Sequence, residues 1–137
     1  MAYVKKFRAK TGAYPIYPTY HMAQALIALK GGYEKAIKAN GGKWPSVEQV
    51  ASAMKGLEFR GFGRPIKIRE DGQGLEDQLI GTTKKVADYP FPVLDNMMII
   101  PAVLGLPPVG QKSPEWVKTI SPSILNSDSI KTYKYIK

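Results

Sequence analysis

The apolar residues of this chain change their spacing at Gly56, and that change constrains the fold more than any other feature of the sequence. Before Gly56 they recur every three to four residues, which is the period of a helix. From Ile66 to Arg69 they alternate with cationic residues, which is the period of a strand. The sequence therefore predicts a mixed α/β chain, with helices in residues 2–56 and strands in residues 57–101.

Two helices and a connector are predicted before residue 41. A basic helix over residues 2–11 is expected to end at Gly12, because glycine adopts the left-handed conformation without a steric penalty. Pro15 and Pro18 predict an extended connector, since the residue before each proline is disfavoured in the helical region. Thr19 is in a position to cap a second helix, whose apolar positions Ala23, Leu26, Ile27 and Ile37 keep a helical period.

Glycine and serine mark the end of this helical region. The pair at 31–32 predicts either a kink or a close contact, because glycine costs roughly 1 kcal/mol in a helix interior. The pair at 41–42 is expected to end the second helix. Ser46 and Gln49 form a capping box for a third helix that stops before Gly56.

The second half of the chain contains turn signals and short apolar runs. Asp71-Gly72 predicts a turn that joins residues 66–69 to residues 79–83 in an antiparallel ribbon, with a further strand at 96–100. Beyond Pro107, proline, glycine, serine and asparagine are frequent, which indicates a surface segment. We assign residues 1–120 to the folded body and residues 121–137 to a surface tail.

Composition narrows the function classes. Lys and Arg number 20 against 11 Asp and Glu, so the net charge is +9 and nucleic acid is a partner to consider. The chain has no cysteine and a single histidine, His21, so zinc or copper binding is not expected, and no cofactor is predicted. A triad that runs through histidine would have to use His21.

Catalysis is not expected. Glu70-Asp71 and Glu76-Asp77 would allow a pair of carboxylates, but adjacent acids near a glycine-rich turn are usually solvated. The glycine pairs at 61–63 and 72–74 lack the third glycine and the helix onset of a phosphate-binding loop. We therefore predict that the chain is not an enzyme.

Tyr14, Tyr17 and Tyr20 recur at every third residue and are our candidate ligand-binding residues. Their rings present an apolar face with a polar tip, which suits the wall of a cleft that holds a small amphipathic solute. The alternative is that the three rings pack between the first two helices.

Five segments in this order resemble the C-terminal part of an ABC transporter substrate-binding protein of the amino-acid, amide and urea receptor class. They are a basic helix, an aromatic entry into an A-x-x-A-L helix, a helix that ends in G-L-x-F, a strand that ends in arginine, and D-x-Q. In this chain they are Val4–Gly12, Tyr17–Leu26, Val47–Phe59, Arg64–Arg69 and Asp71–Gln73.

The resemblance implies a type I periplasmic-binding fold, with two Rossmann-like lobes joined by three crossover segments and a solute held between them. This chain would supply pieces of both lobes, and Tyr17 would face the cleft. The intact parent would be periplasmic and would deliver a branched-chain amino acid, an amide or urea to an ABC permease. The polar N-terminus of this chain lacks a signal peptide, so we expect a fragment that self-associates or binds a partner chain over its open face.

The alternative is a small basic nucleic-acid-binding domain. Tyr133 and Tyr135 alternate with lysines in the tail and are suited to stacking on bases. No RNA-binding, zinc-finger or helix-turn-helix signature accompanies them, so charge is the main support for this reading. Nucleic acid is therefore not the expected partner.

Overall fold

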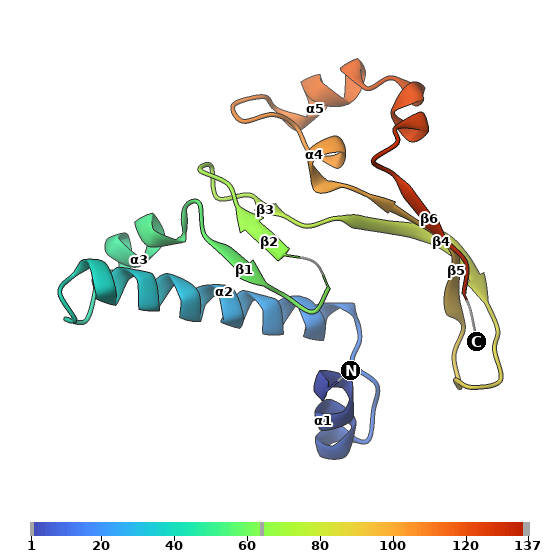
Figure 1. Cartoon of the computed structure of the whole chain (residues 1–137), viewed down its shortest axis with the longest axis horizontal. Helices are drawn as coiled ribbons and strands as arrows, with labels where there is room; N and C mark the ends of the chain where they lie inside the picture. The colour runs from blue at the N-terminus through green and yellow to red at the C-terminus, as the bar shows by residue number, and fades with distance from the viewer. Residues whose placement is uncertain (1, 64, 136–137) are drawn as a thin grey trace. The chain divides into compact units, whose positions relative to one another are not determined.

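The longest element of the computed structural model is α2 (Tyr17–Ala39), a helix of 23 residues. α3 (Val47–Met54) and β1 (Glu58–Arg60) pack along it (Figure 1). The structure describes residues 2–63 and 65–135, and the chain divides into two units, Met1–Gly74 and Leu75–Lys137. Helix and sheet are both present, which confirms the mixed α/β class.

The core of the first unit is built on a stripe of small residues. Ala28, Gly32 and Ala36 recur every fourth residue of α2 and are buried, together with Val50 of α3 and Ile66 of β2 (Pro65–Ile68). The larger apolar residues Leu26 and Ile27 of the same helix are exposed. Small side chains let neighbouring backbones approach α2 closely, and that is the face that packs.

Gly32 shows how close this approach is. A Cβ atom placed on Gly32 would lie 2.6 Å from Cγ of Met54, which is too short for an unstrained contact. α2 continues without interruption through residues 31–32. Of the two readings of this glycine pair, the close contact is therefore confirmed and the kink is wrong.

The helix starts differ in how they are capped. The Ser46 hydroxyl accepts a hydrogen bond from the Gln49 amide, and the Ser46 amide donates to Oε1 of Gln49 at 2.8 Å, so the predicted capping box is confirmed. α2 begins two residues before Thr19, with Pro18 in its first turn, and the Thr19 hydroxyl donates to the Ile16 carbonyl instead of capping the helix. Proline is favoured in a first turn because its φ is already helical, so the predicted cap at Thr19 is wrong.

α1 (Ala2–Thr11) has the predicted bounds, and Gly12 follows it with φ of +72°. The first sheet of the chain has the strand order β1-β2-β3, where β3 is Gly74–Leu75. β1 and β2 are antiparallel, with Phe59 opposite Ile66. The boundary between the two units therefore falls within the last strand of this sheet.

The second unit contains a separate antiparallel sheet with the strand order β4-β5-β6. Its strands are β4 (Gln78–Lys84), β5 (Val93–Ile100) and β6 (Lys131–Tyr133). The predicted ribbon is wrong in its pairing, because residues 79–83 pair with β5 and not with residues 66–69. The turn at Asp71-Gly72 returns the chain for only two residues of β3, whereas the connection over residues 85–92 closes a complete hairpin.

Four short helical elements connect β5 to β6. They are α4 (Ala102–Gly105), α5 (Ser113–Trp116), η1 (Val117–Thr119) and η2 (Pro122–Asn126). These helices and β6 lie outside the ranges that we predicted for helices and strands. Pro114 and Pro122 lie in the first turn of their helices, a position that proline favours, whereas we read both as signals of a surface segment.

Among the described helices, none has the length and apolar character needed to cross a membrane.

Candidate functional site

Tyr17 lies in the first turn of α2 and is the most exposed of the three candidate tyrosines, with 72% of its surface accessible. Its ring stacks on the imidazole of His21 with centroids 3.9 Å apart. Pro15 and Pro18 flank it, and the fixed φ of proline limits the conformations of this segment. Tyr17 therefore presents a ring to the surrounding solution from a stiff part of the backbone.

Tyr20 has a different environment. Its ring lies 5.2 Å from Tyr3 of α1 and 5.4 Å from Phe62, and Tyr3 in turn lies 4.4 Å from Phe62. The Tyr3 hydroxyl donates to the Thr19 carbonyl at 3.0 Å. These rings hold α1 against the start of α2, so Tyr20 belongs to an aromatic cluster that has a structural role.

Tyr14 lies in the connector between the two helices, under the guanidinium of Arg8 at 4.1 Å from the ring centroid. This is the geometry of a cation–π interaction. The structure therefore gives Tyr14, Tyr17 and Tyr20 three different partners and does not bring them together as one wall. Sequence reasoning did not find Tyr3 or Phe62, and no periodic signal connects Phe62 to residues so far away in the chain.

A polar side chain anchors the loop that carries Phe62. Gln24 of α2 is buried, and its Oε1 accepts a hydrogen bond from the Phe62 amide at 3.3 Å. A Cβ atom on Gly61 would lie 2.6 Å from the same oxygen, so a larger residue at this position would have to displace the Gln24 side chain. The loop between β1 and β2 is thus fixed to the helix that carries Tyr17.

An apolar groove of about 370 Å³ lies between α1 and α2. Its largest exposed residues are Met22 and Leu26, which are one helical turn apart on α2. The full lining is Tyr3, Phe7, Pro18, Thr19, Met22, Ala23 and Leu26. Leu26 is 59% exposed, and its place beside an open groove makes it a candidate contact residue.

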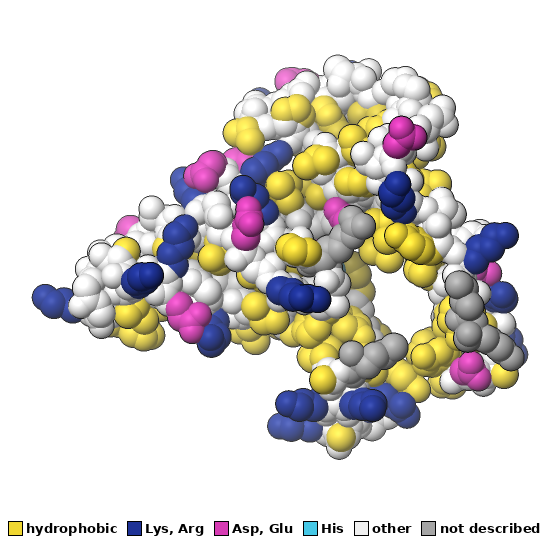
Figure 2. Space-filling view, viewed as in Figure 1, with side chains coloured by type: hydrophobic (Ala, Val, Ile, Leu, Met, Phe, Trp, Pro, Cys, Tyr) yellow, Lys and Arg dark blue, Asp and Glu magenta, His cyan; other side chains and the backbone are white. Residues whose placement is uncertain are grey.

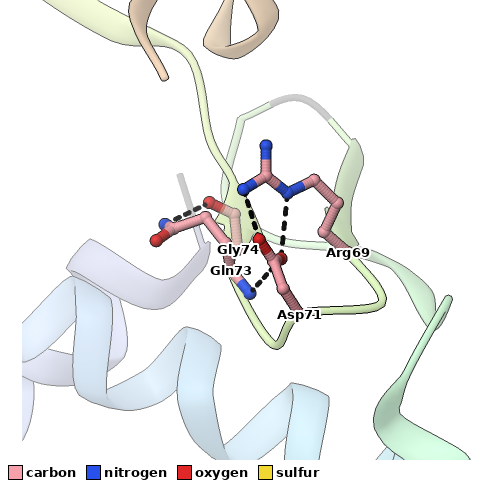
Figure 3. Close-up of polar contacts among 4 residues, drawn as sticks. All are labelled: Arg69, Asp71, Gln73 and Gly74. Carbon is pink, nitrogen blue, oxygen red and sulfur yellow. Dashed lines mark hydrogen bonds and ion pairs between the residues drawn. The ribbon is translucent and has the colours of Figure 1, made fainter. Parts of the chain in front are cut away.

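The turn of the D-x-Q segment is held by its own side chains (Figure 3). Nε of Arg69 donates to Oδ1 of Asp71 at 2.9 Å, and the Gln73 amide donates to the same oxygen at 3.2 Å. The hydrogen bond from Arg69 lowers the pKa of Asp71, and the same bond raises the pKa of Arg69. In its carboxylate form, Asp71 therefore holds this turn together through the hydrogen bonds that it accepts.

The other acid pair that we weighed for catalysis is also engaged. Oδ1 of Asp77 accepts a hydrogen bond from the Ala102 amide at 3.0 Å. This bond ties the start of β4 to the start of α4. No group of three or more His, Cys, Asp or Glu side chains is placed to hold a metal ion within residues 2–63 and 65–135.

Asp95 of β5 has several partners in the second unit. It accepts hydrogen bonds from the backbone amides of Tyr135 at 2.7 Å and Asn96 at 2.8 Å, and it lies 3.4 Å from Nζ of Lys84. The hydrogen bond from Tyr135, with those from Asn96 and Lys84, lowers the pKa of Asp95. Asp95 thus attaches the segment that follows β6 to the sheet.

Two features of the first unit are therefore suited to binding: the exposed ring of Tyr17, and the apolar groove next to it in the chain. The hydrogen bonds of Asp71, Asp77 and Asp95 fix turns and strand ends. No protein-family model, curated protein or solved structure matches the chain.

Proposed function

We propose that this chain is the C-terminal part of an extracytoplasmic solute receptor of an ABC transporter, of the class that binds amino acids, amides or urea. The observation that carries the proposal is that all five resembling segments lie in one compact unit. The chain divides between Gly74 and Leu75, directly after the D-x-Q segment.

The order of the elements before that boundary supports the same proposal. α1, the long α2, the capped α3 and the β1–β2 hairpin follow one another in the order of the five resembling segments. In a type I periplasmic-binding fold, the chain would supply pieces of both Rossmann-like lobes, and the resemblance implies a crossover in the connector at residues 13–18, which leads from α1 into α2.

Tyr17 is our proposed solute contact. Its exposed ring offers an apolar surface, and the start of α2 carries a partial positive charge that favours a solute carboxylate. In the intact receptor, which we place in the periplasm, the solute would be passed to the permease. A partner chain or a second copy would cover the open faces of the fragment, among them exposed Leu79 and Ile80.

The test is thermal unfolding with leucine, short amides and urea. A solute at about one hundred times its Kd stabilises the folded chain by about 2.7 kcal/mol, which would raise Tm by roughly 5–10 °C. Tyr17→Ala should weaken solute binding by roughly 1–3 kcal/mol, the range for an aromatic contact at a binding site.

Trp44→Ala is the matched control. Trp44 is 75% exposed and its ring lies 5.1 Å from that of Tyr33, so it resembles Tyr17 in exposure and in having an aromatic neighbour. The proposal fails if none of these solutes raises Tm or if both variants lose the same affinity. Salt-dependent retention on heparin, without a response to solutes, would favour the nucleic-acid-binding alternative.

A further inference from the structure

The groove between α1 and α2 continues as an exposed apolar ridge. Met22, Leu26 and Leu29 lie at i, i+4 and i+7 on α2 and are 63%, 59% and 41% exposed. From Pro18 to Leu29, this strip is about 17 Å long at the rise of a helix. Exposed apolar residues gathered at helical spacing, next to a concave groove, are typical of a surface that receives another protein segment.

The chain segment that lines the groove carries charge of one sign. Residues 1–33 contain five Lys and Arg and no Asp or Glu. Lys5, Lys6, Arg8 and Lys10 of α1 are exposed. Figure 2 shows Lys and Arg side chains gathered over α1, next to hydrophobic side chains over the start of α2. An occupant of the groove therefore binds more favourably if it carries carboxylates beside its apolar residues.

The same charge argues against two other occupants. A second copy of the chain would bring its own basic α1 to the contact, and like charges at an interface repel. An anionic bilayer would match the charge, but it is flat, whereas the apolar lining includes the half-buried Tyr3 and Phe7 on the floor of a groove.

We propose that this groove binds an acidic amphipathic helix of another protein. The helix would place about three apolar side chains along Met22, Leu26 and Leu29 and would direct Asp or Glu toward α1. This is the helix-in-groove mode. Its apolar anchors supply affinity, and its flanking charges fix the position of the helix in the groove and speed up association. The proposal stands apart from the receptor assignment, because it uses a different surface from the ring of Tyr17.

The test uses two synthetic peptides of about three helical turns. Both place leucine at i, i+3, i+4 and i+7, and their flanking positions are all Glu in one peptide and all Lys in the other. Fluorescence anisotropy should show that the Glu peptide binds at least about tenfold more tightly than the Lys peptide at about 50 mM salt, and that the difference shrinks at about 300 mM salt.

Three variants locate the binding site. The double variant Met22→Ser with Leu26→Ser should weaken binding of the Glu peptide about tenfold or more, because two apolar contacts are lost. Lys5→Gln with Lys6→Gln and Lys10→Gln should also weaken it about tenfold. The matched control, Lys85→Gln with Lys112→Gln and Lys118→Gln, removes the same charge from exposed positions of the second unit and should stay within about twofold.

Circular dichroism of each variant checks that the helices are retained, and all of these substituted side chains are exposed. Equal affinity for the two peptides would overturn the proposal, as would a control variant that loses as much as the α1 variant. It would also be overturned if the chain bound phosphatidylglycerol vesicles and neither peptide, or if Leu26→Ser abolished a dimer of the chain. Loss of the solute response with retained peptide binding would instead count against the receptor assignment alone.

Discussion

The two units of this chain differ in how much they bury. The first packs β1 against α2 and buries four hydrophobic residues, Ala28, Ala36, Val50 and Ile66, from three elements. In the second, Ala102 is the one buried residue among those described, although its sheet has longer strands. Both units thus contain hydrogen-bonded strands, but most of the buried apolar residues among those described lie in the first unit.

This difference matters because burial of apolar surface supplies most of the free energy of folding, whereas each net hydrogen bond contributes about 1 kcal/mol. All seven residues of β4 are exposed, including Leu79 and Ile80 at 57% each. β4 is also an edge strand, since it pairs only with β5 in its sheet. The second unit therefore exposes apolar surface on an edge strand, and we expect a partner chain or a second copy to cover it.

The largest expected effect is in backbone hydrogen exchange. Amides in the middle of α2, around Ala28 and Ala36, should be protected at least about a hundredfold more than amides of β4, because opening α2 exposes the core. Exchange measured by mass spectrometry or NMR at low protein concentration tests this. Equal protection in α2 and β4 would mean that the two units unfold as one cooperative body, which would remove the contrast.

A second prediction concerns the packing of α2 against α3. Gly32→Ala should lower the free energy of unfolding by about 1–3 kcal/mol, because the new methyl group meets Cγ of Met54. Gly31→Ala is the matched control, since its Cβ would meet Leu57 at an ordinary 3.4 Å and should gain up to about 1 kcal/mol of helix propensity. Chemical denaturation of both variants is the measurement, and an opposite order of stability would contradict the close-contact reading of this pair.

The part of the fold that the sequence predicted is the part specified by local chemistry. Gly12 ended α1 and the capping box started α3 as expected, because both effects act within a few residues. The pairing of β4 was missed because residues 71–72 and 85–92 both connect strands, and the partner of β4 is decided by the complete hairpin with β5. β6 joins the sheet about thirty residues after β5, which no local pattern indicates.

The surroundings of the candidate site were not predictable from the spacing of the three tyrosines. Each ring has a different partner because α1 and the loop at Phe62 approach from distant parts of the sequence. The apolar positions of α2, Leu26 among them, keep a helical period, but this spacing does not say which face of the helix is covered. The glycine and alanine stripe of α2 decided that question in the structure.

A third prediction addresses the open edge of the second unit. We expect the chain to self-associate or to recruit a partner, since an exposed apolar edge strand is a template for strand pairing. Ile80→Lys should weaken self-association about tenfold, because a charge on an edge strand opposes pairing. Sedimentation over a wide concentration range measures this. Thr119→Lys, which adds the same charge at an exposed residue of η1, is the control; a monomer at all concentrations would refute the expectation.

The smallest expected effect is local and concerns the attachment of the C-terminal segment to the sheet. Hydrogen bonds from Tyr135 and Asn96 lower the pKa of Asp95 in the folded chain. A lowered pKa means that this contribution to stability is fully present above the pKa of the unfolded chain, near pH 4, and is lost as the pH falls through the folded value. As the pH falls below about 4, β6 should therefore detach before the helices of the first unit unfold.

NMR spectra of the Lys131–Tyr135 amides during acid titration test this order of events. Asp95→Asn should loosen β6 already at pH 7 and should flatten its response to acid, because an amide oxygen accepts hydrogen bonds more weakly than a carboxylate and does not titrate there. Asp88→Asn removes an exposed carboxylate from the β4–β5 connection and should leave the β6 transition in place. If β6 and α2 lose their signals at the same pH in the parent chain, the acid response belongs to the whole molecule, and the second unit is more firmly joined to the first than their difference in burial implies.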